Sequence, residues 1–383
     1  MQRQFTSKVP DVPNEPLFVT AASRRDDTAS LVQSFHFGPA ATSDEEPRFM
    51  EQVQMFIGRA ASQASIKPDL LEYIRSCDHA LRFQIPLRRD NGTIETLTCY
   101  RVQHKHYYMP CKGGVRFTPD LTLQETVGHA IIMSVKMMVG NIPFSGSKGG
   151  VRFDPSQYSE AELQRVTRKY TMELAKKGFI GPHSDSLGPD VGTNSQIMTW
   201  IKDTYVQLYG EKDLNASAVC TGKKITQGGI EGRQSAAGEG AYMTLRKLAN
   251  DEHFCDKADM STGLRGKKFI VQGFGNVGYS LCKAAHNDGA RIIGVIEKDA
   301  GIYNSKGLNP DDLKEHFDTH GTIGNFPGAS EVEIDDPTYI MRKKCHVFAP
   351  CAREGTLNMH NAGHLKAQVV LEGANGPTTF KAD

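Results

Sequence analysis

The sequence predicts an α/β protein with two domains, and three observations lead to this prediction. The chain has 383 residues, whereas a single domain commonly contains about 100–200 residues. Its second half alternates strand-like and helix-like segments, as in a parallel sheet that helices cover on both faces. A glycine-rich stretch between Thr221 and Arg233 separates this half from the first. The expected domains are therefore residues 47–225 and residues 226–383.

Residues 1–46 are expected to lie outside both domains. They are rich in Pro, Ser, Thr and Asp, and no apolar period holds for more than a few residues. Arg3 and Lys8, with no acid among the first ten residues, suit a transit peptide, but Asp11 and Glu15 soon break that pattern. The segment is thus a disordered arm or a targeting segment, and the sequence leaves both interpretations open.

The first domain is expected to contain two short helices, two strands and two long helices. Apolar residues at helical spacing predict the helices, and alternating apolar residues on both sides of an Asp90-Asn91-Gly92 turn predict the strands. Both long helices begin with a capping box, formed by Thr122 with Glu125 and by Ser159 with Glu162. In chain order the expected elements are Phe49–Ile57, Leu70–Ile74, Leu81–Leu87, Thr93–Val102, Thr122–Val139 and Ser159–Lys177.

The second domain is expected to begin with a helix and to continue with alternating strands and helices. Short apolar runs predict the strands. Helical periodicity predicts one helix before the first strand and another between the first two strands. The expected elements are helix Ala236–Asn250, strand Lys267–Gln272, helix Val277–Asn287, strand Arg291–Ile296 and the strand-like runs Cys345–Phe348 and Gln368–Leu371.

The glycines Gly273, Gly275 and Gly278 form a G-x-G-x-x-G motif, which predicts a Rossmann-like dinucleotide-binding domain. The motif follows a strand directly, it opens a helix, and the next strand ends at Glu297, about 20 residues later. Glycines let backbone N–H groups approach a pyrophosphate at the positive end of the helix dipole. Glu297 would bind the ribose hydroxyls and repel a 2′-phosphate, which favours NAD over NADP, while Lys298 partly offsets this preference. An ordinary strand-to-helix turn is the weaker interpretation.

One hexapeptide, Lys-Gly-Gly-Val-Arg-Phe, occurs twice, at Lys112–Phe117 and at Lys148–Phe153. Each copy places a lysine at the mouth of a short strand, with two glycines that let the backbone approach a ligand. Lys136 lies between the copies in an apolar helical stretch, where a lysine either extends to water or binds a buried anion. Any one of these lysines could be an ordinary solvated residue, but together they predict a cluster of ammonium groups.

Such a cluster would suit a small dianionic substrate. Two lysines would bind its carboxylates, and a third, desolvated and repelled by the others, would have a pKa lowered toward neutrality and could transfer protons. Asp190 is a second candidate proton carrier, because Pro189 stiffens the loop 181–190, which also contains Asp185. A role for Asp190 as N-cap of the helix that ends near Leu208 is equally compatible with the sequence.

The composition argues against several other classes of protein. Lys and Arg total 45 and Asp and Glu total 44, so no net field attracts nucleic acid or an anionic membrane. No apolar run approaches the roughly 20 residues of a membrane-spanning helix. Eight cysteines without a C-x-x-C pair are typical of a reduced compartment and suggest neither a disulfide framework nor a zinc site. The expected protein therefore binds no nucleic acid, no membrane and no metal.

From about Pro47 to Asp383 the sequence resembles the glutamate dehydrogenases, in particular the animal mitochondrial form. The segments that carry the resemblance are Cys111–Arg116, Lys136, Gly146–Gly150, Thr171–Pro182, Val271–Gly278 and Glu372–Thr379. The resemblance implies conversion of L-glutamate, water and NAD(P)+ to 2-oxoglutarate, ammonium and NAD(P)H. It also implies a homo-hexamer assembled through the first domain, located in the mitochondrial matrix or otherwise in the cytoplasm.

The resemblance further implies a role for each candidate residue. Lys148 matches the catalytic lysine, which assists the attack of water on 2-iminoglutarate, and Asp190 matches the proton-transferring aspartate. Lys136 matches the residue that binds the α-carboxylate. Lys112 matches the residue that binds the γ-carboxylate, where the leucine, valine and phenylalanine enzymes have an apolar side chain. Arg233 lies near the substrate cleft, and the implied cofactor contacts are Gly273, Gly275, Asn276, Gly278, Glu297 and Asn375.

Several positions depart from the family pattern. Asp185–Pro189 reads Asp-Ser-Leu-Gly-Pro where the family usually has Asp-Val-Pro-Ala-Pro, and Ala237 replaces a threonine on the nicotinamide side. Glu231, Lys283 and Asn287 replace the His, Arg and Arg of GTP inhibition in animal enzymes. The sequence stops at Asp383, where family members continue. Two alternatives therefore stay open: a catalytically silent relative that binds nucleotide or substrate, and a dehydrogenase of apolar amino acids.

Overall fold

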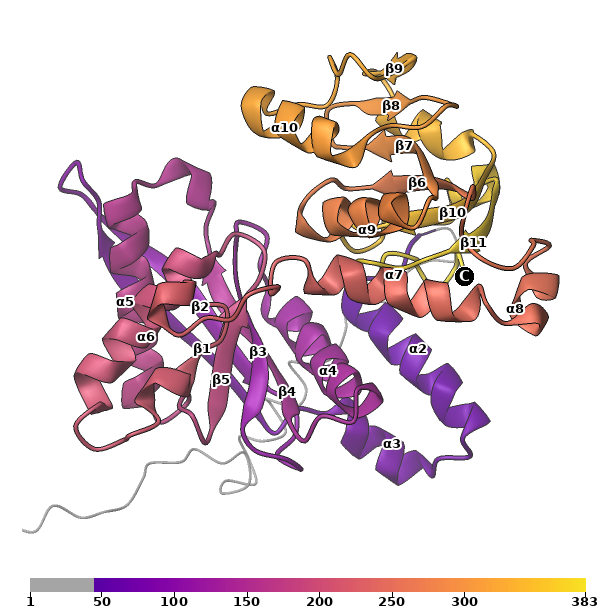
Figure 1. The fold of residues 1–383 in the computed structure, drawn as a ribbon. Helices are drawn as coiled ribbons and strands as arrows, with labels where there is room; N and C mark the ends of the chain where they lie inside the picture. Colours follow the sequence, from indigo (N-terminus) through magenta and orange to yellow (C-terminus); the bar gives the residue numbers. More distant parts are fainter. Residues whose placement is uncertain (1–44) are drawn as a thin grey trace, which may run out of the picture. The chain divides into compact units, whose positions relative to one another are not determined.

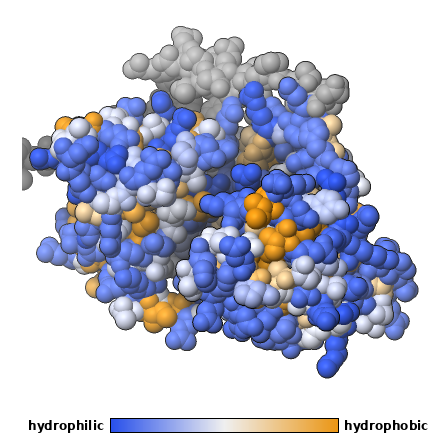
Figure 2. Space-filling model, turned by 90° about the horizontal axis from the view of Figure 1, so that it is seen from above, coloured by the Kyte–Doolittle hydropathy of each residue, from blue (hydrophilic) through white to orange (hydrophobic). Residues whose placement is uncertain are grey.

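The computed structural model describes residues 45–383, so the expected arm or targeting segment, residues 1–46, lies almost wholly outside the described residues. The described chain contains two β-sheets with helices packed against them. The strands of one sheet lie before residue 190, and those of the other lie after residue 267 (Figure 1). This confirms the predicted fold class. None of the helices in residues 45–383 is long and apolar enough to cross a membrane. Figure 2 shows one face, where hydrophilic residues predominate and hydrophobic residues gather in small groups.

The first sheet has five strands in the order β1-β2-β4-β3-β5. Strands β1 and β2 form the expected antiparallel hairpin, β2 is antiparallel to β4, and β3 runs parallel to both β4 and β5. The two copies of the hexapeptide lie side by side on β3 and β4, displaced by two residues, so that Lys112 pairs with Gly146 and Arg116 with Gly150. The strand bounds are β1 His79–Arg88, β2 Ile94–Gln103, β3 Cys111–Thr118, β4 Ser145–Arg152 and β5 Asp185–Pro189.

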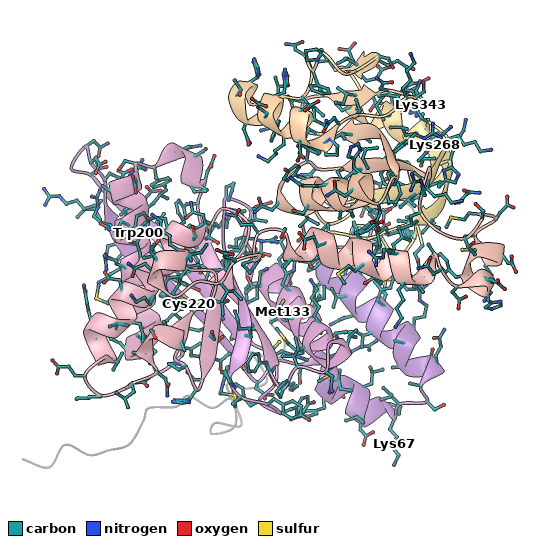
Figure 3. The ribbon with its side chains drawn as sticks, viewed as in Figure 1. Lys67, Met133, Trp200, Cys220, Lys268 and Lys343 are labelled. Atoms are coloured by element: carbon teal, nitrogen blue, oxygen red, sulfur yellow. The ribbon has the colours of Figure 1, made fainter. Side chains whose placement is uncertain are left out.

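Helices pack on both faces of this sheet (Figure 1). On one face α5 and α6 enclose the larger core, which includes the buried side chains of Trp200 and Cys220 (Figure 3). On the other face α4 packs with α2 in a smaller apolar cluster around Ile131. Both predicted capping boxes are present, at Thr122 and at Ser159. The helix bounds are α2 Phe49–Gln63, α3 Pro68–Arg75, α4 Leu123–Val139, α5 Glu160–Lys176 and α6 Ser195–Tyr209.

The structure corrects two expectations about residues 181–195. Asp185–Pro189 is a strand and not a loop, because Leu187 is completely buried in the core and the backbone pairs with β3. Tertiary contacts thus override the turn-forming character of Gly and Pro in this segment. The interpretation of Asp190 as a helix N-cap is wrong, since Asn194 caps α6 by accepting the N–H groups of residues 196 and 197.

The second sheet has six strands in the order β11-β10-β6-β7-β8-β9. The first four are parallel, as expected, and β8 and β9 extend the sheet with antiparallel pairing. The chain leaves β6 for β7 on one side and reaches β10 on the other, so the strand order reverses at β6. The strand bounds are β6 Lys268–Gln272, β7 Arg291–Ile296, β8 Gly301–Tyr303, β9 Glu331–Glu333, β10 Cys345–Pro350 and β11 Ala367–Val370.

Two apolar clusters cover the faces of the second sheet. One contains side chains from α7, α9 and α10, such as Leu245, Leu281 and Leu313, and the other lies under the short helix η4. The α-helices are α7 Ala236–Leu248, α8 Glu252–Lys257, α9 Asn276–Asn287 and α10 Pro310–His320. The 3₁₀ helices of both domains are η1 Pro155–Gln157, η2 Ala216–Val219, η3 Ile225–Gln227, η4 Pro337–Arg342 and η5 Ala362–His364.

The close approach of β3 and β4 gives a stability prediction. In Gly150→Ala, the added Cβ would lie 1.9 Å from the Arg116 carbonyl oxygen, and overpacking of this kind costs about 1–3 kcal/mol. Gly240, inside α7, has no described atom within 4 Å of such a Cβ, so Gly240→Ala should add about 0.5–1 kcal/mol as a better helix former. Urea unfolding measures both variants. An unchanged midpoint for Gly150→Ala would contradict the packing of β3 on β4.

Candidate active site

Three of the four predicted site residues of the first domain, all except Lys136, lie at one face of its sheet. Lys112, Gly114 and Arg116 alternate with buried residues along β3 and therefore project from the same face. The register of β3 with β4 sets Lys148 beside Gly114, and Gly114 pairs with Gly188 of β5. Gly114 and Gly188 leave a strip of bare backbone, which we call the glycine floor. Charged side chains border this floor.

Two distances show how closely the charged groups approach the glycine floor. A Cβ on Gly114 would lie 2.9 Å from the Cβ of Asp190, and a Cβ on Gly188 would lie 2.9 Å from the Lys112 Nζ. Side chains at either position would thus push against Asp190 or Lys112. The floor accordingly holds these two groups near a flat surface that a small molecule can contact.

Lys148 and Asp190 form an ion pair at one edge of the floor. The Lys148 Nζ donates to Asp190 Oδ1 at 2.8 Å, and Lys148 is only 2% exposed. Arg116 donates from Nε to the other oxygen, Asp190 Oδ2, at 2.6 Å. Burial would raise the pKa of the Asp190 carboxyl, but the two cations outweigh it and hold that pKa below its usual range. Burial also lowers the pKa of Lys148, and Asp190 opposes this effect.

Lys112 lies at the other edge of the floor. Its Nζ donates to the Leu187 carbonyl oxygen at 2.9 Å. Burial, together with the nearby charge of Arg101, lowers the pKa of Lys112 to about 8. Three N–H groups are available to a lysine ammonium, so this group can bind an anion while it keeps its bond to Leu187. Lys112 is thus a cation poised close to neutrality.

A fully buried ion pair supports the floor from behind. Arg101 and Asp185 have completely buried side chains, and the Arg101 Nη2 lies 2.6 Å from Asp185 Oδ1. Ser147 donates its hydroxyl to the same oxygen at 2.7 Å. These contacts join β2, β4 and β5. Of the two carboxylates noted in the segment 181–190, Asp185 is therefore part of the scaffold and Asp190 borders the floor.

Lys136 and Arg233 are placed differently from the other two lysines. Lys136 is exposed on α4 and donates to the Asn375 side-chain oxygen, so it meets a neutral amide and not the buried anion that one interpretation expected. This contact brings together a residue expected to bind substrate and one expected to bind cofactor. Arg233 is also exposed, and it influences Lys112 only through its charge. The roles of both residues stay predictions.

Three residues to which the sequence analysis assigned no role complete the charged network. Glu354, in the loop after β10, accepts from Arg116 Nη1 and Nη2 at 3.2 Å, and its Oε1 lies 3.1 Å from His129 Nε2. His129 is buried on α4, and burial lowers its pKa to about 4. Burial opposes ionisation of Glu354, but the His129 hydrogen bond and the Arg116 charge lower its pKa to about 2. Only Arg116 carried a signal, since it belongs to the repeated hexapeptide.

The glycine motif of the second domain lies between β6 and α9, where the strand order reverses. In open α/β sheets, ligands bind at this point. Gly273 has a φ of +89°, and a Cβ there would lie 2.9 Å from the Ala352 backbone. A Cβ on Gly278 would lie 1.8 Å from the Gly273 carbonyl oxygen. These two glycines serve the protein's own packing.

Gly275 differs from the other two glycines of the motif. No described atom lies within 4 Å of the position where its Cβ would be, and its backbone is extended. The open space lies at the N-terminus of α9, beside the exposed Asn276, where unpaired N–H groups attract a phosphate. The loop therefore fits a dinucleotide pyrophosphate.

Glu297 follows β7 and lies against the same loop. Its Oε1 accepts the backbone N–H of Phe274, and its Oε2 accepts that of Lys298 at 3.3 Å. The carboxylate thus lies beside the glycine motif, and its role as a ribose-binding acid stays a prediction. In the described part of the chain, no group of three or more His, Cys, Asp or Glu side chains is arranged to hold a metal ion.

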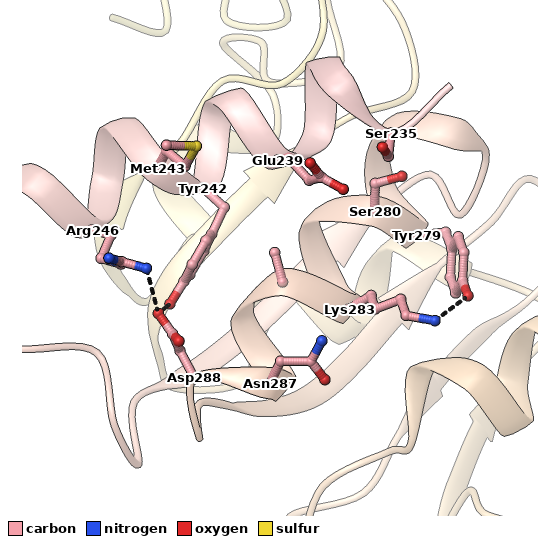
Figure 4. A pocket seen from close by; sticks show the side chains of 11 residues that line it. Ser235, Glu239, Tyr242, Met243, Arg246, Tyr279, Ser280, Lys283, Asn287 and Asp288 are labelled. Atoms are coloured by element: carbon pink, nitrogen blue, oxygen red, sulfur yellow. Dashed lines mark hydrogen bonds and ion pairs between the residues drawn. The ribbon is translucent and has the colours of Figure 1, made fainter. Parts of the chain in front are cut away.

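A separate pocket lies between α7 and α9 (Figure 4). Its two cationic side chains are both engaged with carboxylates: Lys283 contacts Asp311 at 2.9 Å, and Arg246 contacts Asp288 at 3.3 Å. Tyr242 donates to the same Asp288 carboxylate at 2.7 Å. Because these contacts neutralise its cations, the pocket differs from the glycine floor, where Lys112 faces no carboxylate at hydrogen-bond distance among the described residues.

Comparisons with known proteins agree with this geometry. Residues 78–207 match the "Glu/Leu/Phe/Val dehydrogenase, dimerisation domain", and residues 228–383 match "Glutamate/Leucine/Phenylalanine/Valine dehydrogenase". The mitochondrial glutamate dehydrogenase of Dictyostelium discoideum is 40% identical over 343 residues, which cover 90% of this chain and 68% of that protein. The catabolic NAD-specific glutamate dehydrogenase of Bacillus subtilis is 32% identical over 344 residues, which cover 89% of this chain and 77% of that protein.

Solved structures show the same similarity. The hetero-hexameric glutamate dehydrogenase from Thermus thermophilus, in its Leu bound form, superposes with a TM-score of 0.76 at 34% sequence identity. The match covers 88% of this chain and 78% of that one. The glutamate dehydrogenase from Peptoniphilus asaccharolyticus gives a TM-score of 0.68 at 28% identity, with 88% and 77% of the two chains covered.

The open space at Gly275 gives a binding prediction. Gly275→Ala should fold like the wild type, because the new methyl group meets no described atom within 4 Å. It should weaken NADH binding by at least about tenfold, or 1.4 kcal/mol, because the methyl group takes the place of the pyrophosphate. NADH fluorescence titration measures the affinity, and Gly240→Ala is the matched control. Unchanged NADH affinity in Gly275→Ala would show that the nucleotide binds elsewhere.

Proposed function

The chain belongs to the Glu/Leu/Phe/Val dehydrogenase family, and from this premise we propose that it catalyses the reversible oxidative deamination of L-glutamate. Glutamate and water give 2-oxoglutarate and ammonium, and NAD(P)+ accepts a hydride. The observation that carries the proposal is the pair of the buried Lys148 with the half-buried Asp190 at 2.8 Å, on a glycine floor that Lys112 borders from the other side. A proton-transfer pair and a separate cation thus share one small surface.

In the proposed complex, Lys112 binds the γ-carboxylate of glutamate and Lys136 binds its α-carboxylate. Lys112 supports this role because it is half-buried and has N–H groups beyond the one that Leu187 accepts. Lys136 would exchange its bond to Asn375 for the substrate carboxylate, which frees the amide. Arg233 would add positive charge at the entrance. The glycine floor lets the carbon chain of the substrate lie against the backbone of β3 and β5.

Lys148 and Asp190 would carry the proton chemistry. Oxidation of the amine yields an imine, and water must lose a proton as it attacks the imine carbon. Lys148 is suited to hold and release that proton, because burial brings the pKa of its ammonium below its usual value. Asp190 touches Lys148 and can pass the proton onward to the departing amine. When bound, the nicotinamide supplies the hydride acceptor for the oxidation step.

The cofactor would lie along the second domain. Gly273, Gly275, Gly278 and Asn276 would hold the pyrophosphate at the start of α9, and Asn375 would contact the nicotinamide half. Glu297 would bind the ribose hydroxyls, and its negative charge favours NAD over NADP. The Bacillus relative, named NAD-specific, supports this preference.

Three further properties belong to the same proposal. We infer a substrate and oligomerisation domain at residues 47–225 and a dinucleotide-binding domain at residues 226–383. A homo-hexamer is supported by the Thermus relative, which is a hetero-hexameric glutamate dehydrogenase. A mitochondrial location is supported by the Dictyostelium relative, whose name includes "mitochondrial". Light scattering and imaging of a tagged full-length protein test the last two.

Lys148→Ala should abolish most of the activity while the fold persists. Loss of a positioned proton-transfer group costs about 10²–10⁴-fold in rate. NADH formation from glutamate and NAD+, followed by absorbance, measures the effect, and Lys177→Ala, at an exposed lysine on the end of α5, is the control. Background rates in both the wild type and Lys148→Ala would instead favour a catalytically silent relative that only binds.

Lys112→Leu should change the substrate preference. The substitution removes a charge-assisted hydrogen bond to the γ-carboxylate, worth about 1.5–3 kcal/mol, so kcat/KM for glutamate should fall by about 10–100-fold. The value for leucine should rise, because the new side chain is apolar. Steady-state kinetics with both amino acids measure this change. A wild-type enzyme that prefers leucine or phenylalanine to glutamate would show that the protein is an apolar amino-acid dehydrogenase.

A further inference from the structure

A chain of charged contacts links the second domain to the Lys148–Asp190 pair. It begins at His129 on α4, whose Nε2 lies 3.1 Å from Glu354 Oε1. The same oxygen accepts from both Nη atoms of Arg116 at 3.2 Å. Arg116 Nε then donates to Asp190 Oδ2 at 2.6 Å, and Asp190 Oδ1 accepts from Lys148 at 2.8 Å. Four of these residues come from the first domain, and Glu354 alone comes from the second.

The position of Glu354 depends on the second domain. It lies in the loop after β10, two residues beyond Ala352, whose backbone would lie 2.9 Å from a Cβ on Gly273. The loop that carries Glu354 therefore packs against the first glycine of the proposed dinucleotide site. A shift of that loop moves the carboxylate relative to β3 and α4.

Glu354 and Asp190 share a single guanidinium group. Arg116 presents Nε to Asp190 and both Nη atoms to Glu354, and its side chain is only 12% exposed. Charges in such partly buried places act on one another more strongly than in water. As long as Glu354 holds the two Nη atoms, only Nε reaches Asp190, and part of the Arg116 charge is neutralised.

We propose that Glu354 is a positioning residue through which the second domain controls proton exchange between Lys148 and Asp190. While Glu354 accepts the Nη atoms of Arg116, it neutralises part of the guanidinium charge, and Asp190 can exchange a proton with Lys148. When Glu354 withdraws, Arg116 directs its full charge at Asp190 and keeps it ionised. The proton-transfer pair thus becomes competent when the domains bring Glu354 to Arg116. This inference rests on the proposed roles of Lys148 and Asp190.

The charged groups around Lys148 and Asp190 determine the expected effect on the titration of Lys148. Asp190 is faced by Lys148, which lies on β4, and by Arg116, which lies on β3. Glu354 is faced by Arg116 and by His129, which lies on α4. At Lys148, burial lowers the pKa most, Asp190 and Glu354 raise it, and Arg116 lowers it. The charges of Asp190 and Glu354 also reach Lys136 on α4. Loss of Glu354 and loss of Arg116 therefore shift the titration of Lys148 in opposite directions.

The test measures the titration of Lys148 without turnover. The full chain, free of substrate and nucleotide, is treated briefly with formaldehyde and a borane reductant across a pH series, and methylation of Lys148 is quantified by peptide mass spectrometry. Only the neutral amine reacts. We expect Glu354→Gln to lower the pH of half-maximal labelling by about half a unit or more, and Arg116→Gln to raise it. Glu315→Gln, the same change on exposed α10, is the matched control and should leave it unchanged.

The results separate this inference from the proposed function. Shifts of opposite sign support the role of Glu354, while equal midpoints in Glu354→Gln and the wild type, or shifts of the same sign in both variants, overturn it. Glu354→Asp, which keeps the charge, should restore most of the wild-type midpoint. In active protein the pH profile of kcat/KM should shift with the labelling midpoint. Absence of glutamate oxidation in the wild type would refute the proposed function alone, because the labelling requires no activity.

Discussion

The candidate site depends on one steric constraint, the direct approach of neighbouring backbones in the middle of the first sheet. A Cβ on Gly113 would lie 1.6 Å from the Ser147 carbonyl oxygen, and one on Gly150 would lie 1.9 Å from that of Arg116. Neither position accepts a side chain without moving a strand. These glycines belong to the same two strands as Lys112, Arg116 and Lys148, so close packing of β3 on β4 leaves charged groups around bare backbone.

Such a site has to keep charges in a place that water reaches poorly. Ionised groups there are stabilised only when each has a partner, because an unpaired buried charge costs several kcal/mol. Asp190 meets this requirement twice, through Lys148 and Arg116, and Asp185 meets it through Arg101 behind the floor. Lys112 has only a carbonyl oxygen, at Leu187. An anionic substrate therefore gains the most binding free energy at a cation whose only partner is neutral.

The sequence predicted those parts of the molecule that local signals determine. The capping boxes at Thr122 and Ser159, the turn at Asp90–Gly92 and the glycine motif at Gly273 each act within a few residues, and the structure contains all of them. Strand β5 was missed because its pairing with β3, some 70 residues away in the chain, overrides a turn-like composition. Glu354 was missed for the same reason, since its partners Arg116 and His129 are more than 200 residues away.

Two contacts between the halves of the chain would make the proposed substrate and nucleotide sites interdependent. Lys136 is bonded to Asn375, and Arg116 is bonded to Glu354. In each pair, one residue borders the substrate surface and the other lies on the second domain. A ligand that displaces either partner must supply the lost interaction, so binding at one surface changes the free energy of binding at the other by the same amount in both directions. Ordered charges at the boundary would therefore couple the two proposed sites.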